Sequence, residues 1–479
     1  MQMRLPIPRA ERGNPVSSSA MSNGRSWEFT FIDLFAGVGG FHHALAGLGG
    51  TCKLAVELDR EARAVYAASF PEMHLEQIQA DIRSLTRETP DADAAELDED
   101  EIRARVPEHD VLCAGFPCQP FSKSGAQLGV RDKTRGTLFF DVMSIVIARQ
   151  PRFVILENVR NLAGPRHTET WSTIVESLRE AGYRISDEPV VMSPHLLAPW
   201  EGGAPQVRDR VFVLAERVTP AVAEDERRVE PLLRREPTPD WDPHRWDVRE
   251  ILGSDAADAY AIRDSERGWL EAWQAFVQMI PDEMLPGFPI WFDAFVTEPD
   301  VSAETPKWKA DFLVKNAAFY RRHQKLIDAW RKKKWGPLNE RVEDFPPSRR
   351  KFEWQAGRAQ KNRKARDLEG LVAHFRPSGI RVKPPTYVPA LVAITQTSVV
   401  GPKVSGTEWR RLTPREAAEL QGIPFDGFEA ARATDKAIYK QLGNAVNVGV
   451  VRFVARTLFD SAGLVIGSVL ANSEASRTA

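Results

Sequence analysis

The sequence predicts an α/β protein in which a doubly wound sheet forms the main domain and a second, irregular domain is inserted late in the chain. Apolar runs of strand length alternate with helical segments between residues 27 and 215. The alternation stops at about residue 216, where most of the thirteen tryptophans and many prolines follow, and it returns near residue 405. Two apolar runs end in loops rich in glycine or proline, which is where open α/β sheets hold their ligands.

Composition places the chain among ordinary globular proteins. Of its 479 residues, 43% are hydrophobic and 27% are charged, and the net charge is −2. This length is sufficient for two or three domains. Cys52, Cys113 and Cys118 cannot form a disulfide framework and lack zinc-site spacing, so we expect a reducing cytoplasm and no metal. No stretch approaches the roughly 20 apolar residues of a membrane span. Residues 1–26 and 467–479 are expected to be flexible tails.

The first predicted strand leads into a glycine loop. The apolar run of residues 29–35 stops at Ala36-Gly37-Val38-Gly39-Gly40, and helical spacing follows over residues 41–48. Glycine lets bare backbone approach a ligand at the head of a helix, as nucleotide-binding turns do. Because any tight strand-to-helix turn also favours glycine, the loop alone leaves both interpretations open.

Acidic residues follow the next strands. Glu57 comes twenty residues after Gly37, where doubly wound folds place an acid that accepts hydrogen bonds from ribose hydroxyls. The Gly-x-Gly-Gly spacing departs from the dinucleotide pattern, which favours a nucleoside cofactor without a pyrophosphate. Asp81, before Ile82, could offer a carboxylate to an adenine amino group, although a surface turn would look the same.

A cysteine between two prolines follows the apolar run of residues 111–114. Pro117 and Pro120 cannot continue that strand or begin an interior helical turn, so Cys118 is expected on a stiff loop at the strand's end. A single cysteine is more often a buried, space-filling thiol, so the loop alone leaves both interpretations of Cys118 open.

Charged side chains flank the next two apolar runs, following residues 153–156 and preceding residues 211–215. Glu157 directly follows residues 153–156, and burial there would raise its pKa and make it a proton donor; a glutamate at the solvent edge of the sheet is the alternative. Strand alternation puts Gln206, Arg208 and Arg210 on one face, as a row of donors aimed at acceptor oxygens.

The inserted region contains a basic stretch. Residues 321–366 hold 16 lysines and arginines against five acidic residues, interleaved with aromatic side chains. Such a run is commonly a solvated helix, but it also suits a surface that contacts phosphates.

Regular patterning then returns at residue 411. Thr413, Pro414 and Glu416 have the spacing of a capping box with proline in the first helical turn. Residues 441–448 lead into a last apolar helix that ends at about Phe459.

Six segments, taken in order, closely resemble the motifs of the DNA (cytosine-5) methyltransferases. The likeness covers roughly residues 27–215 and 405–465, with order and spacing intact, and six joint matches are far more specific than any one. The segments are residues 33–40, 117–122, 157–159, 206–210, 411–422 and 441–446.

The resemblance implies a domain organisation. A Rossmann-like, S-adenosylmethionine-dependent methyltransferase domain would consist of residues 27–215 and 405–466. The target-recognition domain would occupy residues 216–404 between them.

The resemblance also implies the chemistry. The Cys118 thiolate would add to C6 of a cytosine flipped out of duplex DNA, so that C5 becomes nucleophilic enough to take a methyl group. Glu157 would stabilise the charge that develops at N3, and Arg210, with Arg208, would contact the O2 atom of the base.

On the cofactor side, the resemblance assigns Phe35 to stacking on adenine, Glu57 to the ribose and Asp81 to the adenine amino group. The glycine-loop backbone would contact the methionine part, and S-adenosylhomocysteine would be the product. The full implied set is Asp33, Phe35, Ala36, Gly37, Val38, Gly39, Gly40, Glu57, Leu58, Asp81, Ile82, Pro117, Leu138, Asn444, Ala445 and Val446.

The implied partners are double-stranded DNA and a cognate restriction endonuclease that acts separately. We expect a monomer without membrane attachment, in the bacterial cytoplasm and associated with the nucleoid through DNA. The basic stretch would contact the DNA backbone, and base-reading residues are expected nearer 370–400.

Two other functions compete with this one. The tRNA-methylating branch of the family has little inserted sequence, so the long insertion argues against it. A catalytically silent DNA-binding relative would not need Cys118, Glu157 and Arg210. One departure concerns packing: the family often has proline after the Asn444 segment, whereas Val448 is followed here by Gly449.

Overall fold

The computed structural model describes nine segments of the chain. They are residues 27–91, 94–117, 138–218, 225–233, 235–253, 257–281, 285–356, 366–393 and 398–466. Cys118, the rest of its loop through residue 137, and the two predicted tails lie outside the described residues.

A nine-stranded sheet forms the larger unit, in the order β10-β6-β9-β5-β4-β1-β2-β3, with β7 also paired to β9. The strands β3, β2, β1, β4 and β5 run parallel, and β9 is antiparallel to both β5 and β6. The order reverses between β1 and β4, which confirms the doubly wound α/β fold. The strands are β1 (Phe29–Leu34), β2 (Gly50–Val56), β3 (Ile78–Gln79), β4 (Val111–Ala114), β5 (Phe153–Val159), β6 (Tyr183–Ser186), β7 (Val190–Met192), β9 (Arg210–Arg217) and β10 (Arg228–Val229).

Helices cover both faces of this sheet because its strands are apolar on both sides. The β1 side chains Phe29 and Phe31 belong to one core, with α1, α2 and α13, while Ile32 and Leu34 belong to the other, with α4, α5 and α6. The helices are α1 (Gly40–Ala46), α2 (Arg60–Ser69), α3 (Arg83–Thr86), α4 (Glu99–Arg105), α5 (Leu138–Arg149), α6 (Thr168–Glu180) and α13 (Val448–Ser461).

The inserted unit has a six-stranded sheet of its own, in the order β11-β12-β14-β13-β16-β17. It is more regular than the sequence indicates, because strands of two to five residues leave little periodicity to detect. Buried aromatic side chains, among them Trp273, Phe276 and Trp330, form its core. Its elements are β11 (Ile290–Trp291), β12 (Lys351–Trp354), β13 (Val372–Arg376), β14 (Gly379–Lys383), β16 (Val399–Val400), β17 (Arg410–Arg411), α7 (Asp264–Met279), α8 (Lys307–Arg331) and α9 (Pro402–Ser405).

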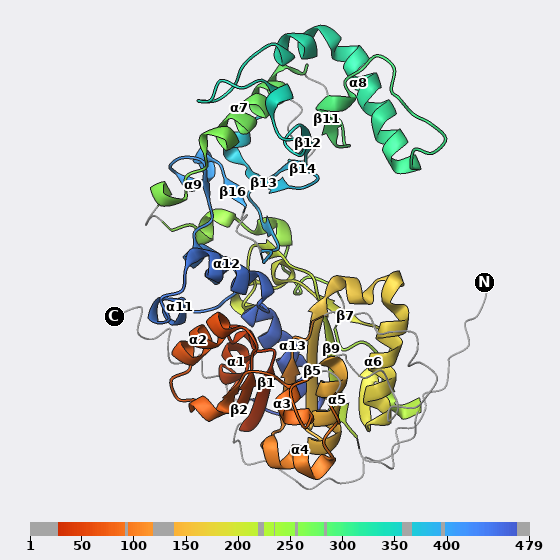
Figure 1. The fold of residues 1–479 in the computed structure, drawn as a ribbon, viewed down its shortest axis with the longest axis vertical. Helices are drawn as coiled ribbons and strands as arrows, with labels where there is room; N and C mark the ends of the chain where they lie inside the picture. The colour runs from red at the N-terminus through yellow and green to blue at the C-terminus, as the bar shows by residue number, and fades with distance from the viewer. Residues whose placement is uncertain are drawn as a thin grey trace, which may run out of the picture.

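The two units lie one above the other along the long axis of the molecule, with α12 near their junction (Figure 1). A two-stranded parallel sheet joins them: β8 (Gln206–Val207) pairs with β15 (Val388–Pro389). The chain then returns to the larger unit through α10 (Pro414–Glu419), α11 (Asp426–Ala430) and α12 (Asp435–Asn444). None of the helices described here has the length and apolar character needed to cross a membrane.

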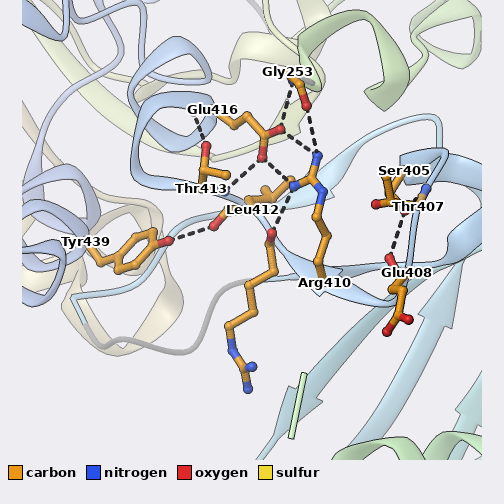
Figure 2. Close-up of polar contacts among 10 residues, drawn as sticks. Gly253, Ser405, Thr407, Glu408, Arg410, Leu412, Thr413, Glu416 and Tyr439 are labelled. Atoms are coloured by element: carbon orange, nitrogen blue, oxygen red, sulfur yellow. Dashed lines mark hydrogen bonds and ion pairs between the residues drawn. The ribbon is translucent and has the colours of Figure 1, made fainter. Parts of the chain in front are cut away.

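A buried ion pair connects the returning chain to the inserted unit (Figure 2). The predicted capping box is present, since the Glu416 amide donates to Thr413 Oγ1 at 3.2 Å and the Thr413 amide donates to Glu416 Oε2 at 2.8 Å. The same carboxylate accepts from Arg410 of β17 at 2.7 and 2.9 Å, and from the Gly253 amide at 2.9 Å. Glu416 therefore caps α10 and also holds two segments of the inserted unit, at Gly253 and Arg410, against this helix.

Glu416→Gln is expected to lower the free energy of unfolding by about 3–5 kcal/mol, because it leaves the Arg410 guanidinium buried without its countercharge. The matched control is Glu429→Gln, whose carboxylate pairs with Arg415 at 2.5 Å where both side chains are more than half exposed. That change should cost less than about 1 kcal/mol. Urea unfolding measures the free energy of unfolding of both variants, and equal losses would contradict the structural role of the Arg410–Glu416 ion pair.

Candidate functional site

A hollow of about 630 Å³ opens where the carboxyl ends of β1, β4 and β5 meet the start of β9. We call it the strand-end hollow. It draws on both parts of the larger unit and on the chain that leaves the inserted unit. Its described lining residues are Phe35, Gly37, Glu57, Asp59, Ala62, Gly115, Phe116, Pro117, Glu157, Asn158, Val159, Arg210, Ala390, Leu391, Val392, Ala393, Lys440, Gln441, Gly443 and Asn444.

The glycine loop serves two different purposes. Gly37 has φ +56° and its missing Cβ would meet nothing within 4 Å, so the loop is bare at this residue, which lines the hollow. A Cβ on Gly39 would lie 2.3 Å from the Phe70 ring, and one on Gly40 would lie 2.6 Å from Val446 Cγ2. The first glycine suits close approach of a ligand, whereas the other two are required by packing within the protein.

The Glu57 carboxylate accepts a hydrogen bond from the backbone of this loop. Its Oε2 atom accepts from the Gly37 amide at 2.8 Å, and its Oε1 atom accepts from the Asp59 amide at 2.7 Å. A carboxylate has about four lone-pair positions, so both oxygens can still accept from hydroxyl groups of a ligand.

An ion pair at the same rim was not predicted from the sequence. Lys440 of α12 donates to Asp59 Oδ2 at 2.6 Å, and this hydrogen bond holds the pKa of Asp59 below its usual value. Asp59 also caps α2 by accepting from the Glu61 amide at 2.9 Å. The position of Asp59 between a strand and a helix indicates a cap, but nothing near it in the chain points to a lysine 381 residues away.

Glu157 and Arg210 form a pair inside the hollow. Arg210 Nε lies 2.8 Å from Glu157 Oε1, and both side chains are largely buried. Burial raises the pKa of Glu157, although the nearby Arg210 and Arg208 guanidinium groups partly oppose this shift. The structure thus places a carboxyl group with raised proton affinity beside a cation, as expected for Glu157 from its position after a buried strand.

Arg208 lies outside the hollow and is 1% exposed. Its guanidinium donates to the Leu391 carbonyl at 2.9 Å, the Gly443 carbonyl at 2.8 Å and the Ala445 carbonyl at 2.6 Å. Burial lowers its pKa to about 9, so it stays charged at neutral pH. The predicted row of donors therefore divides: Arg210 faces the hollow, Arg208 binds backbone carbonyls, and Gln206 is buried against Gln421.

Asn158 acquires a role that the sequence did not indicate. Its Nδ2 atom donates to the Phe116 carbonyl at 2.9 Å, across from β5 to the end of β4. This contact holds the segment that leads through Pro117 toward Cys118. In the sequence, the only indication of a role for Asn158 was its position directly after Glu157.

The structure brings five of the sixteen predicted cofactor residues to the strand-end hollow: Phe35, Gly37, Glu57, Pro117 and Asn444. Asp33 is fully buried, which raises the pKa of its carboxyl group well above the usual value, whereas Leu58 is 72% exposed. Those outside the described lining are Asp33, Ala36, Val38, Gly39, Gly40, Leu58, Asp81, Ile82, Leu138, Ala445 and Val446.

Comparison with known proteins gives matches over most of the chain. A family model described as C-5 cytosine-specific DNA methylase matches residues 29–460. The type II methyltransferase M.AluI of Cellulosimicrobium cellulans is 39% identical and aligns over 90% of this chain and 91% of its own. M.BanI of Aneurinibacillus aneurinilyticus is 30% identical, over 90% and 96%. M.HhaI of Haemophilus parahaemolyticus is 37% identical over only 39% of this chain and 49% of its own. The alignments that extend over most of this chain are those with M.AluI and M.BanI.

Gly443→Ala is expected to lower the free energy of unfolding by about 1–3 kcal/mol and to weaken ligand binding in the strand-end hollow. Its new Cβ would lie 2.4 Å from the Ala393 amide nitrogen, forcing α12 away from residues 391–393. Gly370→Ala is the matched control, because nothing lies within 4 Å of its Cβ position. Thermal unfolding compares the two variants, and equal stability would contradict the close packing of α12 against residues 391–393.

Proposed function

This chain belongs to the family of C-5 cytosine-specific DNA methylases, and we propose that it transfers a methyl group from S-adenosylmethionine to C5 of a cytosine flipped out of duplex DNA, through a covalent adduct of Cys118 with C6. One observation carries this proposal. Glu57 and the open Gly37 line the same hollow as the buried Glu157–Arg210 pair, and Pro117, which directly precedes Cys118 in the chain, lines it too.

The residues of the strand-end hollow fit the proposed cofactor. Glu57 has lone pairs left for a ribose diol, Gly37 leaves open space, and Phe35 offers a ring at the same rim. S-adenosylmethionine supplies an electrophilic methyl group and leaves as S-adenosylhomocysteine. Asn444 and Pro117 would complete the enclosure, while Asp33, Ala445 and Val446 support it from the core.

The Glu157–Arg210 pair suits the pyrimidine ring. Because burial raises the pKa of Glu157, this group can supply a proton to N3 as negative charge develops in the ring. Arg210 uses Nε for Glu157 and Nη1 for the Asp209 carbonyl, so its remaining donors can bind the O2 atom. Arg208 then acts as a positioning residue, since its donors reach backbone carbonyls of the wall.

Cys118 provides the bond that activates C5. Its thiolate forms a bond to C6, and the electron pair of the C5–C6 double bond becomes available to capture the methyl group at C5. Loss of the C5 proton re-forms the double bond and expels the thiolate. The chemistry needs a base outside the helix stack, because C6 is inaccessible in a paired duplex.

Double-stranded DNA would lie against the inserted unit, which we propose as the target-recognition domain. Within the basic stretch, Lys332, Lys333 and Lys334 are exposed and can reach phosphates, whereas Arg349 and Arg366 are buried and donate to backbone carbonyls. Two of the aligned relatives are named type II methyltransferases and match this chain nearly end to end. We therefore propose a bacterial restriction-modification or stand-alone enzyme that works as a monomer in the cytoplasm, with any cognate endonuclease acting separately.

Incubation with labelled S-adenosylmethionine and mixed duplex DNA, followed by bisulfite sequencing, is expected to show 5-methylcytosine at one sequence motif. Cys118→Ser should abolish transfer and keep DNA binding, and Glu157→Gln should lower kcat by about 10²–10⁴-fold. Exposed Glu176→Gln is the control and should leave kcat unchanged. No 5-methylcytosine on any DNA would refute the function, and near-normal turnover of Cys118→Ser would reject its role as nucleophile.

Replacing Lys332, Lys333 and Lys334 together by glutamine is expected to weaken DNA binding and to flatten its salt dependence. Each lost phosphate contact should reduce the slope of log K against log salt by about 1. Arg103→Gln on α4, which is tied up with Glu99 and Asp100, serves as the control. An unchanged slope in the triple variant would remove this segment from the DNA interface.

A further inference from the structure

One face of the β13–β14 hairpin is basic, and the other is apolar. The antiparallel register sets His374 opposite Arg381 and Val372 opposite Lys383. Alternation places Arg376 on the face of His374, and all four side chains are only partly buried. Burial lowers the pKa of His374 to about 4, so the cations of this face are Arg376, Arg381 and Lys383. The opposite face packs into the aromatic core through Ala373, Phe375, Ile380 and Val382. The hairpin is thus held firmly from one side and displays cations on the other.

This basic face lines a second hollow, of about 510 Å³, which we call the hairpin hollow. Its other described walls come from Val207 of β8 and from Pro389, Ala390 and Val392, which follow the hairpin in the chain. Ala390 and Val392 also line the strand-end hollow, so the two hollows share a wall. In Figure 1 the hairpin lies on the side of the inserted unit that faces the larger unit.

The basic face carries more positive charge than its surroundings balance. Glu353 of β12 binds Arg381, but among the described residues no carboxylate lies within ion-pair distance of Arg376 or Lys383. Burial, and then the charge of Arg381, lower the pKa values of both Arg376 and Lys383. Placing like charges together costs stability in the free protein, which indicates a ligand rich in negative charge or acceptor atoms.

The geometry of Arg381 narrows the nature of that ligand. Its Nε and Nη2 atoms both donate to Glu353 Oε2, at 2.9 and 2.7 Å. One edge of the guanidinium is thereby occupied, and the fork made by Nη1 and the second Nη2 hydrogen is left for a bidentate partner. Among the base edges of the major groove, guanine O6 and N7 match this fork, and a two-stranded β-ribbon can enter that groove.

We propose that Arg381, oriented by Glu353, reads a guanine in the recognition sequence of this enzyme, with Arg376 and Lys383 contacting acceptors beside it. The proposal rests on the methyltransferase function proposed above, and it names a specificity-determining residue for that reaction. The shared wall of Ala390 and Val392 would keep the guanine contact at a constant offset from the pocket that receives the cytosine. A phosphate contact, which needs charge but no fork, is the competing role for Arg381.

The test compares Arg381→Gln and Arg381→Lys on a duplex library in which the bases around the target cytosine are randomised, with methylation mapped by bisulfite sequencing. Both variants should lose about 5- to 150-fold selectivity at a single position, which is a G·C pair in the wild-type motif, and keep selectivity elsewhere. Arg381→Lys retains the charge but lacks the planar fork, so a phosphate contact survives in it while the fork contact is lost. If Arg381→Gln weakens binding but keeps the wild-type motif, Arg381 contacts DNA by charge alone and the proposal is wrong.

Two further variants complete the experiment. Glu353→Gln should relax the same position as Arg381→Gln, because it frees the guanidinium to rotate. Arg184→Gln is the matched control: Arg184 pairs with Glu216 at 2.7 Å in the sheet of the larger unit, and its loss should leave the motif unchanged. Relaxation at all positions alike, or at none, would overturn the proposal. A wild-type protein that makes no 5-methylcytosine would instead refute the proposed function, which distinguishes the two failures.

Discussion

The buried guanidinium of Arg208 is the contact on which both hollows depend. A charged group without water is costly unless its donors find acceptors, and the two terminal nitrogens of Arg208 donate to carbonyls from two distant segments, while its buried Nε has no protein partner among the described residues. It lies between β8 and β9, binds residue 391 as the chain leaves the inserted unit, and binds residues 443 and 445 of the returning chain. One side chain thus joins the three segments whose neighbours line the strand-end hollow, and it fixes the wall that the hairpin hollow shares.

Close backbone approach near Arg208 explains two glycines of the returning chain, Gly443 and Gly449. A Cβ on Gly443 would collide with residues 392 and 393, and a Cβ on Gly449 would lie 1.8 Å from the Gly202 carbonyl oxygen. The absent side chain of Gly449 lets α13 pack against the loop at Gly202. Gly449 is not among the described residues that line the strand-end hollow, so its contact concerns packing.

Local sequence was sufficient for features built from neighbouring residues. The doubly wound sheet, the glycine loop, Glu57 and the Thr413–Glu416 capping box could be predicted because each depends on periodicity or on spacing within a few tens of residues. Arg208 shows where such reasoning fails. Alternation treats residues 206–210 as one strand, but β8 ends at Val207 and β9 begins at Arg210, so the side chains diverge. Its partners lie 183 to 237 residues away, as Lys440 lies far from Asp59, and no local pattern encodes those meetings.

Hydrogen exchange of Arg208→Met tests the clamp most directly, with Arg210→Met as the comparison because it removes a neighbouring guanidinium that donates to Glu157 instead. If Arg208 holds the two segments, peptides covering residues 388–393 and 441–448 should both exchange about tenfold faster or more in Arg208→Met, and neither should do so in Arg210→Met. Unchanged exchange of both segments in Arg208→Met would contradict the central role of this side chain.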